Sequence, residues 1–398
     1  MAGPLTVLCV ATYLKGEEFL RECRRRGCRV LLLTAEPLAD APWPRESIDR
    51  MLTVPRDAPE DRILRAVEVA ARTERIDRIA ALDDFDVEAA AMLREALRVP
   101  GMGETTARYF RDKLAMRMRA RFAGMRVPEF VHVLNHDAIA AWARRVPPPW
   151  MMKPRSSAAA IGIRRLESEP QLWDAIEQAG EGQSRYLLET FVSGDVYHVD
   201  SIVCGRRVVF AAPHKYGRPP FEVAHHGGIF VTRRLADDGE EGAALLELNA
   251  RLLEAFHLER GVSHTEFIRS ENGQWHFLET AARVGGAFIV DVIEAATGLN
   301  LWREWAALEI AGEAGTYTVP PHRRDYAGIV LSLARQAEPD TSAYTDPEIV
   351  HRVRKHHHAG LIVAAPEAER VERLVTEYTA RFYADFHASA PVPDRPAD

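Results

Sequence analysis

Short apolar runs alternate with amphipathic stretches along the first hundred residues of the chain. Uninterrupted apolar runs of this length are typical of parallel strands buried on both faces, and they occur at 5–11, 29–34 and 76–82. Apolar positions recur at helical spacing in residues 17–26, 61–73 and 87–97. Because strand and helix alternate, we predict an open α/β domain over residues 1–103, which ends at Pro100-Gly101-Met102-Gly103.

The pattern changes after residue 103 to helices mixed with antiparallel strands. The predicted helices are 104–122, 137–145, 243–256, 289–297, 301–311 and 367–387. The predicted strands begin at Val127 and continue with 150–154, 186–192, 196–203, 207–212, 264–268, 275–278 and 326–333. These elements predict an α+β arrangement with a small lobe at 104–185, a large lobe at 186–318 and a C-terminal lobe at 319–390. A disordered tail is predicted at 391–398.

One predicted hairpin carries two glutamates that strand pairing would bring together. Residues 264–268 alternate between polar and apolar, Glu271-Asn272-Gly273 is a turn signal, and a second short strand follows. If the strands pair, Glu266 and Glu279 lie side by side, and adjacent buried carboxylates repel each other unless a cation separates them. Mg²⁺ suits this position because it prefers carboxylate and phosphate oxygens together. The competing interpretation is a surface hairpin with two solvated glutamates.

Two stretches have the composition of lids. The strand Trp150 to Pro154 contains Lys153, and the small residues 156–162 follow it. Small residues after a strand can form a flap over a phosphate, with Lys153 as the point charge, although an ordinary surface hairpin would show the same pattern. Residues 216–228 are rich in Gly, Pro and His, and long loops of this kind are often functional lids.

Composition excludes several classes of function. The formal net charge of −7 disfavours general binding to nucleic acid or to anionic membranes. The apolar residues 5–10 are too short to span a membrane and have no basic region before them, so we predict a strand there. Without any CxxC pair, the cysteines are expected to be free thiols in a reducing cytosol, namely Cys9, Cys23, Cys28 and Cys204. We therefore expect a cytoplasmic protein.

Three other patterns favour structural roles. The turn at residues 11–16 is not GxGxxG, so a dinucleotide site is unsupported. Thr12 and Asp83 to Asp86 follow predicted strands, where ligands can bind, but a helix N-cap cluster is the favoured interpretation. His356-His357-His358 cannot easily converge on one metal ion from a strand, so we predict a solvated turn.

Five short segments occur in a characteristic order. They are Arg111-Asp112-Lys113, Met152-Lys153-Pro154 with its flap, Glu189-Thr190-Phe191-Val192 with Asp195 and His198, Glu266, and Glu279 to Gly286. Each is weak alone, but together they resemble the ATP-grasp superfamily over nearly the whole chain. The resemblance implies an open α/β pre-ATP-grasp domain, a two-lobed ATP-grasp domain and a small C-terminal lobe.

The resemblance also implies ATP and Mg²⁺ as cofactors, with one or two ions and with Mn²⁺ as a substitute. The residues that would bind the nucleotide are Lys113, Lys153, Ser156, Ser157, Glu189, Thr190, Phe191, Val192, Asp195 and His198. Among them, Glu189 would accept from the adenine amino group, and His198 would lie near the ribose or phosphates. Glu266 and Glu279 would hold the metal. Arg283 would hold the substrate carboxylate and, with Lys153, act in catalysis.

The chain departs from the family pattern at two places. Ala281 stands where the E-x-N-x-R-x-G motif has Asn, which removes one metal ligand and puts a two-metal geometry in doubt. The flap has Ser and Ala at 156–160, where glycines are common, so its closure is expected to be stiffer. Without nucleotide we also expect Glu266 and Glu279 to repel, so that one of them keeps its proton to unusually high pH.

The implied reaction is ATP-dependent joining of a small-molecule carboxylate to an amine through an acyl phosphate, with ADP and phosphate released. An amino-acid or dipeptide ligase is the specific form we expect, with a homodimer as one assembly the family allows. A biotin-carboxylase-like or purine-biosynthetic carboxylating enzyme is the nearest alternative. Ala281 motivates a third hypothesis, a non-catalytic regulatory protein that binds ATP.

Overall fold

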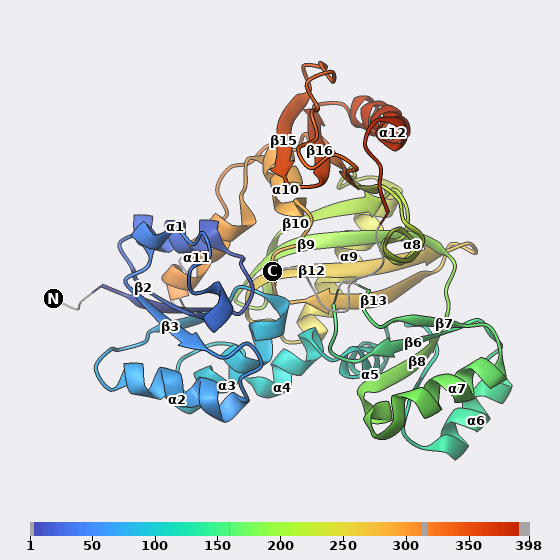
Figure 1. Ribbon diagram of the computed structural model, residues 1–398, viewed down its shortest axis with the longest axis horizontal. Helices are drawn as coiled ribbons and strands as arrows, with labels where there is room; N and C mark the ends of the chain where they lie inside the picture. Colours follow the sequence, from blue (N-terminus) through green and yellow to red (C-terminus); the bar gives the residue numbers. More distant parts are fainter. Residues whose placement is uncertain (1–3, 159, 313–316, 390–398) are drawn as a thin grey trace.

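The computed structural model describes residues 4–158, 160–312 and 317–389. Its N-terminal part is a parallel sheet in the order β3-β2-β1-β4, flanked by helices (Figure 1). The strands are β1 (Thr6–Ala11), β2 (Arg29–Ala35), β3 (Arg50–Val54) and β4 (Arg78–Ala81). The helices are α1 (Glu17–Arg25), η1 (Glu36–Leu38), η2 (Arg45–Ser47), α2 (Glu60–Ala71), η3 (Asp84–Asp86) and α3 (Val87–Leu97). The predicted open α/β fold is confirmed; β3 was missed because most of this edge strand is only partly buried.

A second, small sheet has the order β5-β8-β6-β7. Its strands are β5 (Phe130–His132), β6 (Trp150–Pro154), β7 (Arg164–Leu166) and β8 (Tyr186–Thr190). The helices of this part are α4 (Glu104–Ala107), η4 (Arg108–Phe110), α5 (Lys113–Phe122), α6 (His136–Arg145), α7 (Glu169–Ala179) and η5 (Gly180–Arg185). Buried Trp142, Trp150 and Leu172 join α6 and α7 to the sheet in one core.

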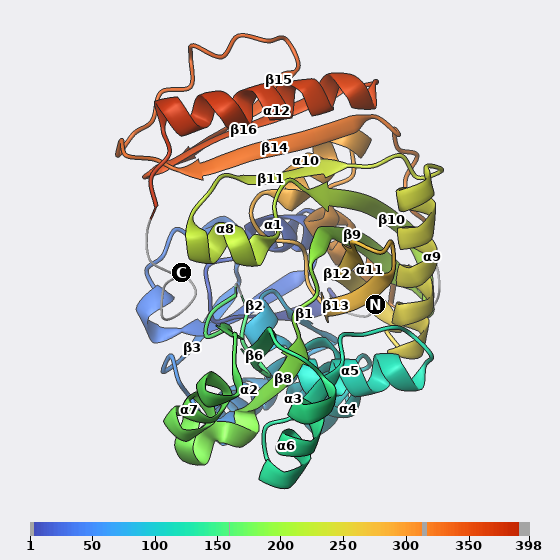
Figure 2. The ribbon, with the colours of Figure 1, turned by 90° about the vertical axis from the view of Figure 1, so that its right-hand side faces the viewer.

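An eight-stranded antiparallel sheet in the order β13-β12-β9-β10-β11-β14-β16-β15 forms the rest of the molecule. Its strands are β9 (Gly194–Cys204), β10 (Arg207–Tyr216), β11 (Phe230–Arg234), β12 (Arg260–Ser270), β13 (Trp275–Ala281), β14 (Tyr326–Leu333), β15 (Ile349–Lys355) and β16 (His358–Ala365). Its helices are α8 (Pro220–His226), α9 (Glu240–Ala255), α10 (Ile289–Thr297), α11 (Leu301–Ala311) and α12 (Ala368–Asp385). In Figure 2, α12 lies along β14 and β16, and α9 lies beside β9 and β10.

Alternation along β9 divides its side chains between the two faces of this sheet. Tyr197 and Val199 pack with Leu245 of α9 in one core, while Ile202 packs with Ile293 of α10 in another. His198 and Asp200 are therefore together on the face away from α9.

Two predicted elements are wrong in detail. The single helix predicted over 104–122 is interrupted, because the Asp112 side chain accepts from the backbone N–H of Leu114 at 2.9 Å and caps a new helix at Lys113. The predicted loop at 216–228 contains α8, which begins with Pro220 in its first turn, a position where proline suits a helix.

The large sheet is continuous across the predicted lobe boundary at residue 319, because β11 pairs with β14. The division into lobes stays a prediction, and the predicted tail at 391–398 lies outside the described residues. His356 and His357 form the turn between β15 and β16, as predicted.

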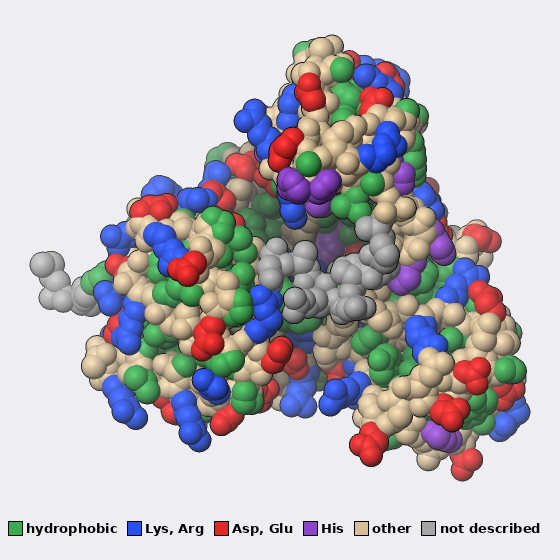
Figure 3. Space-filling model, viewed as in Figure 1, with side chains coloured by type: hydrophobic (Ala, Val, Ile, Leu, Met, Phe, Trp, Pro, Cys, Tyr) green, Lys and Arg blue, Asp and Glu red, His purple; other side chains and the backbone are tan. Residues whose placement is uncertain are grey.

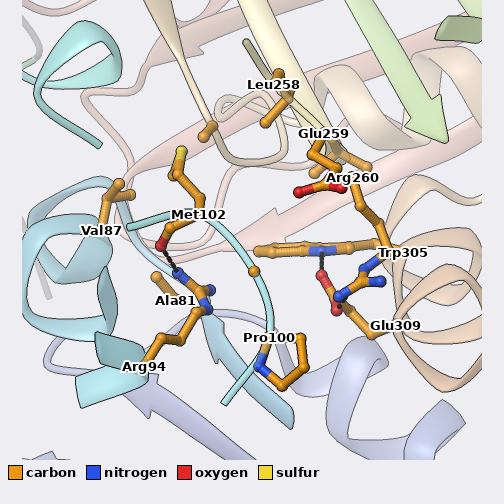
Figure 4. Close-up of a pocket in the computed structure, with 14 residues that line it drawn as sticks. Ala81, Val87, Arg94, Pro100, Met102, Leu258, Glu259, Arg260, Trp305 and Glu309 are labelled. Carbon is orange, nitrogen blue, oxygen red and sulfur yellow. Dashed lines mark hydrogen bonds and ion pairs between the residues drawn. The ribbon is translucent and has the colours of Figure 1, made fainter. Parts of the chain in front are cut away.

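The N-terminal domain is held against the large sheet mainly through α11. The rings of Phe19 and Trp305 pack edge to face at 5.1 Å between centroids. Figure 4 shows a small cavity at this junction, with Arg94 on one side and Trp305 on the other. The buried Arg94 guanidinium donates to the carbonyl oxygens of Ile79 and Met102, and Trp305 donates to Glu309. None of the predicted site residues lines this cavity, so this part of the domain junction lies away from the site.

The acidic run after β4, Asp83 to Asp86, makes structural contacts, and Asp83 is the predicted helix N-cap. Asp83 caps η3 by accepting from the N–H of Phe85 at 3.0 Å, and it pairs with Lys15. Asp86 accepts from the backbone N–H of Thr12 at 2.9 Å and from its hydroxyl at 2.7 Å. Burial and the nearby charge of Asp83 raise the pKa of Asp86 to about 7, although both bonds from Thr12 act the other way.

Asp86 should therefore make the free energy of unfolding depend on pH. Its pKa is higher in the folded state than the value of about 3.9 for an unfolded chain, so its contribution is full below about pH 4 and is lost as pH rises through about 7. Asp86→Asn does not titrate, and the amide can still pair with Thr12. Relative to the parent, the variant should gain up to about 1.4 kcal/mol per pH unit in that window. Urea unfolding of both proteins across the window measures this, and parallel curves would contradict it.

Candidate active site

The two glutamates of the predicted hairpin are direct cross-strand partners. β12 pairs with β13 in the register Glu266↔Glu279, and a β-bulge follows immediately. Directly paired side chains share one face of a sheet, and Glu266 and Glu279 have side-chain exposures of 16% and 39%. Two carboxylates thus stand together on the face that also carries His198 and Asp200, since His198 pairs with Glu266 in β9.

Lys113 neutralises Glu279 in this structure. Its Nζ lies 3.0 Å from Oε2 of Glu279 and donates to the backbone oxygen of Ser157 at 2.7 Å. Burial raises the pKa of Glu279, but Lys113 and then Lys153 outweigh it and lower the pKa to about 2. The prediction that one glutamate of the pair keeps its proton to high pH is therefore wrong for Glu279, because two lysines from the small lobe supply the positive charge.

The predicted motif at 111–113 gives each residue a separate contact. Arg111 pairs with Asp84 at 2.8 Å and donates to the backbone oxygen of Ser156, so it links the N-terminal domain to the flap. Asp112 caps α5 and pairs with Arg155. Because Lys113 donates to the backbone oxygen of Ser157, the motif holds the backbone at the start of the flap. Ala159 of the flap lies outside the described residues.

Lys153 and Glu189 form a buried ion pair across the small sheet. Lys153 Nζ lies 2.5 Å from Oε1 of Glu189, and Arg117 donates from Nε to the other oxygen at 2.9 Å. Burial raises the pKa of Glu189, but the charges of Arg117 and Lys153 lower it overall. Because both oxygens already accept from cations, Glu189 orients Lys153 in this structure. Its role toward the adenine amino group stays a prediction.

The predicted hinge leaves one backbone donor available. Thr190 N–H donates to Glu129 at 2.8 Å and Phe191 N–H donates to Pro149 at 3.0 Å, so both are used within the fold. Among the described residues, the N–H of Val192 donates to no protein acceptor. The edge of a ligand ring could pair with the backbone there, as the resemblance implies. Asp195, beyond the hinge, pairs with Lys215 at 2.7 Å.

His198 is fully buried. Its side chain has 0% exposure and lies 2.6 Å from Asp200 and 2.7 Å from the hydroxyl of Thr232. Both ring nitrogens are thus already hydrogen-bonded within the protein, and the predicted place of His198 near the ribose or phosphates stays a prediction. Burial lowers the pKa of His198 despite the charge of Asp200, which favours a neutral ring.

Arg283 follows β13 and makes one side-chain hydrogen bond within the part of the chain that the structure describes. Its Nη1 donates to the backbone oxygen of Val284 at 3.0 Å, and among the described residues no carboxylate lies within ion-pair distance of its guanidinium. Burial lowers its pKa, but the more distant charges of Asp84 and Asp83 raise it overall, so the group stays cationic. A partly buried guanidinium that no carboxylate of the described residues pairs with is suited to bind a substrate anion.

Several residues near Glu266 and Glu279 could not be assigned to the site from the sequence. They are Arg117, Asp200, Tyr216, Thr232 and His264, together with His214, whose ring stacks on that of His198 at 4.6 Å. Two signals were available: His264 stands two positions before Glu266 in one strand, and Arg117 stands four positions after Lys113 in one helix. Figure 3 shows this face of the molecule, hollowed where the N-terminal domain, the small lobe and the C-terminal strands meet.

Comparisons with known proteins agree with this architecture. No protein-family model matches the chain. It is 26% identical over 233 residues to an L-arginine-specific L-amino acid ligase from Bacillus subtilis, and the matched stretch covers 57% of this chain and 56% of that protein. It is 24% identical over 195 residues to a D-alanine–D-alanine ligase from Dechloromonas aromatica strain RCB, and the matched stretch covers 48% of this chain and 64% of that protein. The chain thus spans between half and two thirds of these relatives.

Solved structures match over nearly the whole chain. An L-amino acid ligase from Bacillus licheniformis superposes with a TM-score of 0.74 at 16% identity and covers 97% of this chain and 99% of its own. An N5-carboxyaminoimidazole synthetase from Staphylococcus aureus gives 0.72 at 15% identity, with 96% and 98% covered. Within the described residues, every helix is too short or too polar to cross a membrane. These likenesses show that the chain shares the fold of the amino acid ligase and the carboxyaminoimidazole synthetase, and the paired glutamates lie within that fold.

Proposed function

We propose that this protein is an ATP-dependent ligase that joins a small-molecule carboxylate to an amine, with ADP and phosphate as the other products. The observation that carries the proposal is the cluster of Glu266, Glu279, Lys113 and Lys153 together with Arg283, whose guanidinium has no carboxylate within ion-pair distance among the described residues. Two carboxylates, two ammonium groups and one guanidinium are the donor set that a phosphoryl transfer to a carboxylate needs.

The residues present fit ATP and Mg²⁺. Glu266 and Glu279 offer adjacent oxygens, and Mg²⁺ is usually held by one or two carboxylates together with substrate phosphates. The metal would neutralise developing negative charge on the phosphoryl group. Solved structures of similar fold contain ADP, ATP or MgADP. Because Ala281 offers no ligand, we propose one firmly held ion, with Mn²⁺ able to replace it.

The chain's own residues would then divide the work. Lys113 and Lys153 would bind phosphate oxygens and reduce the repulsion between a carboxylate and the nucleotide. Glu189 would keep Lys153 in place, and the N–H of Val192 would bind the adenine edge. Arg283 would orient the substrate carboxylate, which becomes an acyl phosphate before the amine attacks. The flap would exclude water, which otherwise hydrolyses that intermediate.

The specific form that we propose is an amino-acid ligase, because two of the curated relatives are named as ligases of amino acids. Incubation of the protein with ATP, Mg²⁺ and pairs of amino acids should release phosphate and ADP in equal amounts, with a dipeptide mass for the preferred pair. ADP release that needs bicarbonate would point instead to the carboxylating alternative, which the synthetase and carboxylase structures represent. Nucleotide binding with no ADP formed across the panel would favour the non-catalytic hypothesis.

A further inference from the structure

A buried chain of polar side chains lies beside the paired glutamates. Asp200 Oδ2 accepts from His198 Nδ1 at 2.6 Å, and Asp200 Oδ1 lies 2.9 Å from Nδ1 of His264. Thr232 continues the chain beyond His198. Asp200 has 0% exposure, and both of its oxygens are engaged by imidazole rings. A fully buried carboxylate is retained only when partners satisfy it, so Asp200 depends on both histidines and they depend on it.

One end of this chain reaches the proposed metal ligand Glu266. The hydroxyl of Tyr216 donates to Oε1 of Glu266 at 2.9 Å. His264 Nε2 lies 3.5 Å from that hydroxyl and 3.6 Å from the same Glu266 oxygen. The orientation of Glu266 is thus set by Tyr216 and His264, and the ring of His264 is held from its other nitrogen by Asp200.

Asp200 also meets the segment that carries Arg283. A Cβ atom built on Gly285 would lie 2.7 Å from Oδ1 of Asp200 and 3.1 Å from Nδ1 of His264. Only glycine allows the backbone to approach this closely. Arg283 stands two residues earlier, so the same buried carboxylate supports both the metal side and the substrate side of the proposed site.

A metal ion held by these residues themselves is the alternative. His198, Asp200 and His264 offer ligand atoms within 4.8 Å of one another, the one such group among the described residues. However, the two nitrogens that face Asp200 are already in hydrogen bonds of 2.6 and 2.9 Å. Imidazole ligands need a lone pair toward the ion, so a hydrogen-bonded bridge fits these contacts better.

We propose that Asp200 is a positioning residue, which holds Glu266 for metal binding through His264 and Tyr216 and places Arg283 through its close contact with Gly285. The inference rests on the proposed function, because Glu266 and Arg283 receive their roles from it. Partners that orient a metal ligand typically change metal affinity by about 10- to 100-fold when they are removed.

The first test is Mn²⁺ binding in the presence of a non-hydrolysable ATP analogue, measured by electron paramagnetic resonance, which does not require turnover. Asp200→Asn should weaken Mn²⁺ binding by about 10-fold or more. Thr265→Val is the matched control. It removes a buried hydrogen bond of 2.8 Å to Thr280, between β12 and β13, on the face opposite to Glu266 and Glu279. Both variants should lose stability, but only Asp200→Asn should lose metal affinity.

The second test separates the substrate side. Gly285→Ala presses a methyl group against Asp200 and His264, and it should raise KM for the carboxylate substrate more than it lowers kcat. Gly286→Ala should have the smaller effect, because no atom lies within 4 Å of a Cβ built there.

The outcomes are distinguishable. If the parent binds Mn²⁺ with the analogue and Asp200→Asn binds it equally well, the positioning role is wrong and the proposed function stands. A parent that binds neither metal nor nucleotide overturns the proposed function and this inference with it. Stoichiometric zinc in the purified parent, lost in Asp200→Asn, would overturn the inference in favour of a bound ion.

Discussion

Replacement of Lys153 by Met is expected to lower turnover by about two to three orders of magnitude, the loss typical of one preorganised electrostatic contact. Lys153 Nζ lies 2.5 Å from Glu189, its side chain is 15% exposed, and its charge also lowers the pKa of Glu279. The ammonium is therefore held in place before any ligand arrives. Met keeps the length of the apolar stem and removes the charge together with the ion pair to Glu189. Steady-state ADP release measures the effect, with thermal unfolding to check the fold.

The matched control is Lys355→Met, which removes an exposed lysine at the end of β15. It should leave ADP release within a factor of about two, since surface charges far from a site contribute little. If Lys153→Met released ADP at nearly the parental rate, Lys153 would not act on the phosphates. If it lost activity only because it unfolded, the thermal transition would fall in parallel.

Glu279→Gln is expected to be the more damaging of the two substitutions in the hairpin, with a fall in kcat of about two to three orders of magnitude. Glu279 is the closer of the pair to the lysines: Lys113 lies 3.0 Å from it, and its low pKa keeps it ionised at any working pH. The amide would remove a metal ligand and leave the ammonium group of Lys113 without its counter-charge. Glu266→Gln loses one ligand but leaves Lys113 paired with Glu279.

Titration of activity with Mg²⁺ distinguishes these expectations. Both variants should need more Mg²⁺ than the parent, whereas Glu271→Gln, in the exposed turn of the same hairpin, should behave like the parent. Equal and mild losses for both site variants at saturating Mg²⁺ would leave the fold assignment intact but remove the catalytic role of the pair.

Much of the fold could be predicted because local periodicity reports burial. Continuous apolar runs in the first hundred residues marked strands β1, β2 and β4, which are buried on both faces. Edge strands such as β3 expose part of each face, so their pattern is weak. The break in the helix at 104–122 depended on one capping carboxylate, Asp112, whose role could not be distinguished from that of any other acidic residue in a charged stretch.

The β-bulge between Glu266 and Phe267 brings Glu279 opposite Glu266, because the register beside the turn would place Leu278 there. The sequence by itself determined that these two strands form a hairpin, because a turn signal separates them. It also determined that His198 and Asp200 share a face, because side chains alternate along a strand. Tertiary structure alone decided which charges meet them. Lys113 and Glu279 are brought to 3.0 Å by the packing of a helix on a sheet, and no local pattern encodes that distance. For this reason the sign of the pKa shift at Glu279 and the burial of His198 were both unpredictable: each depends on elements far away in the chain.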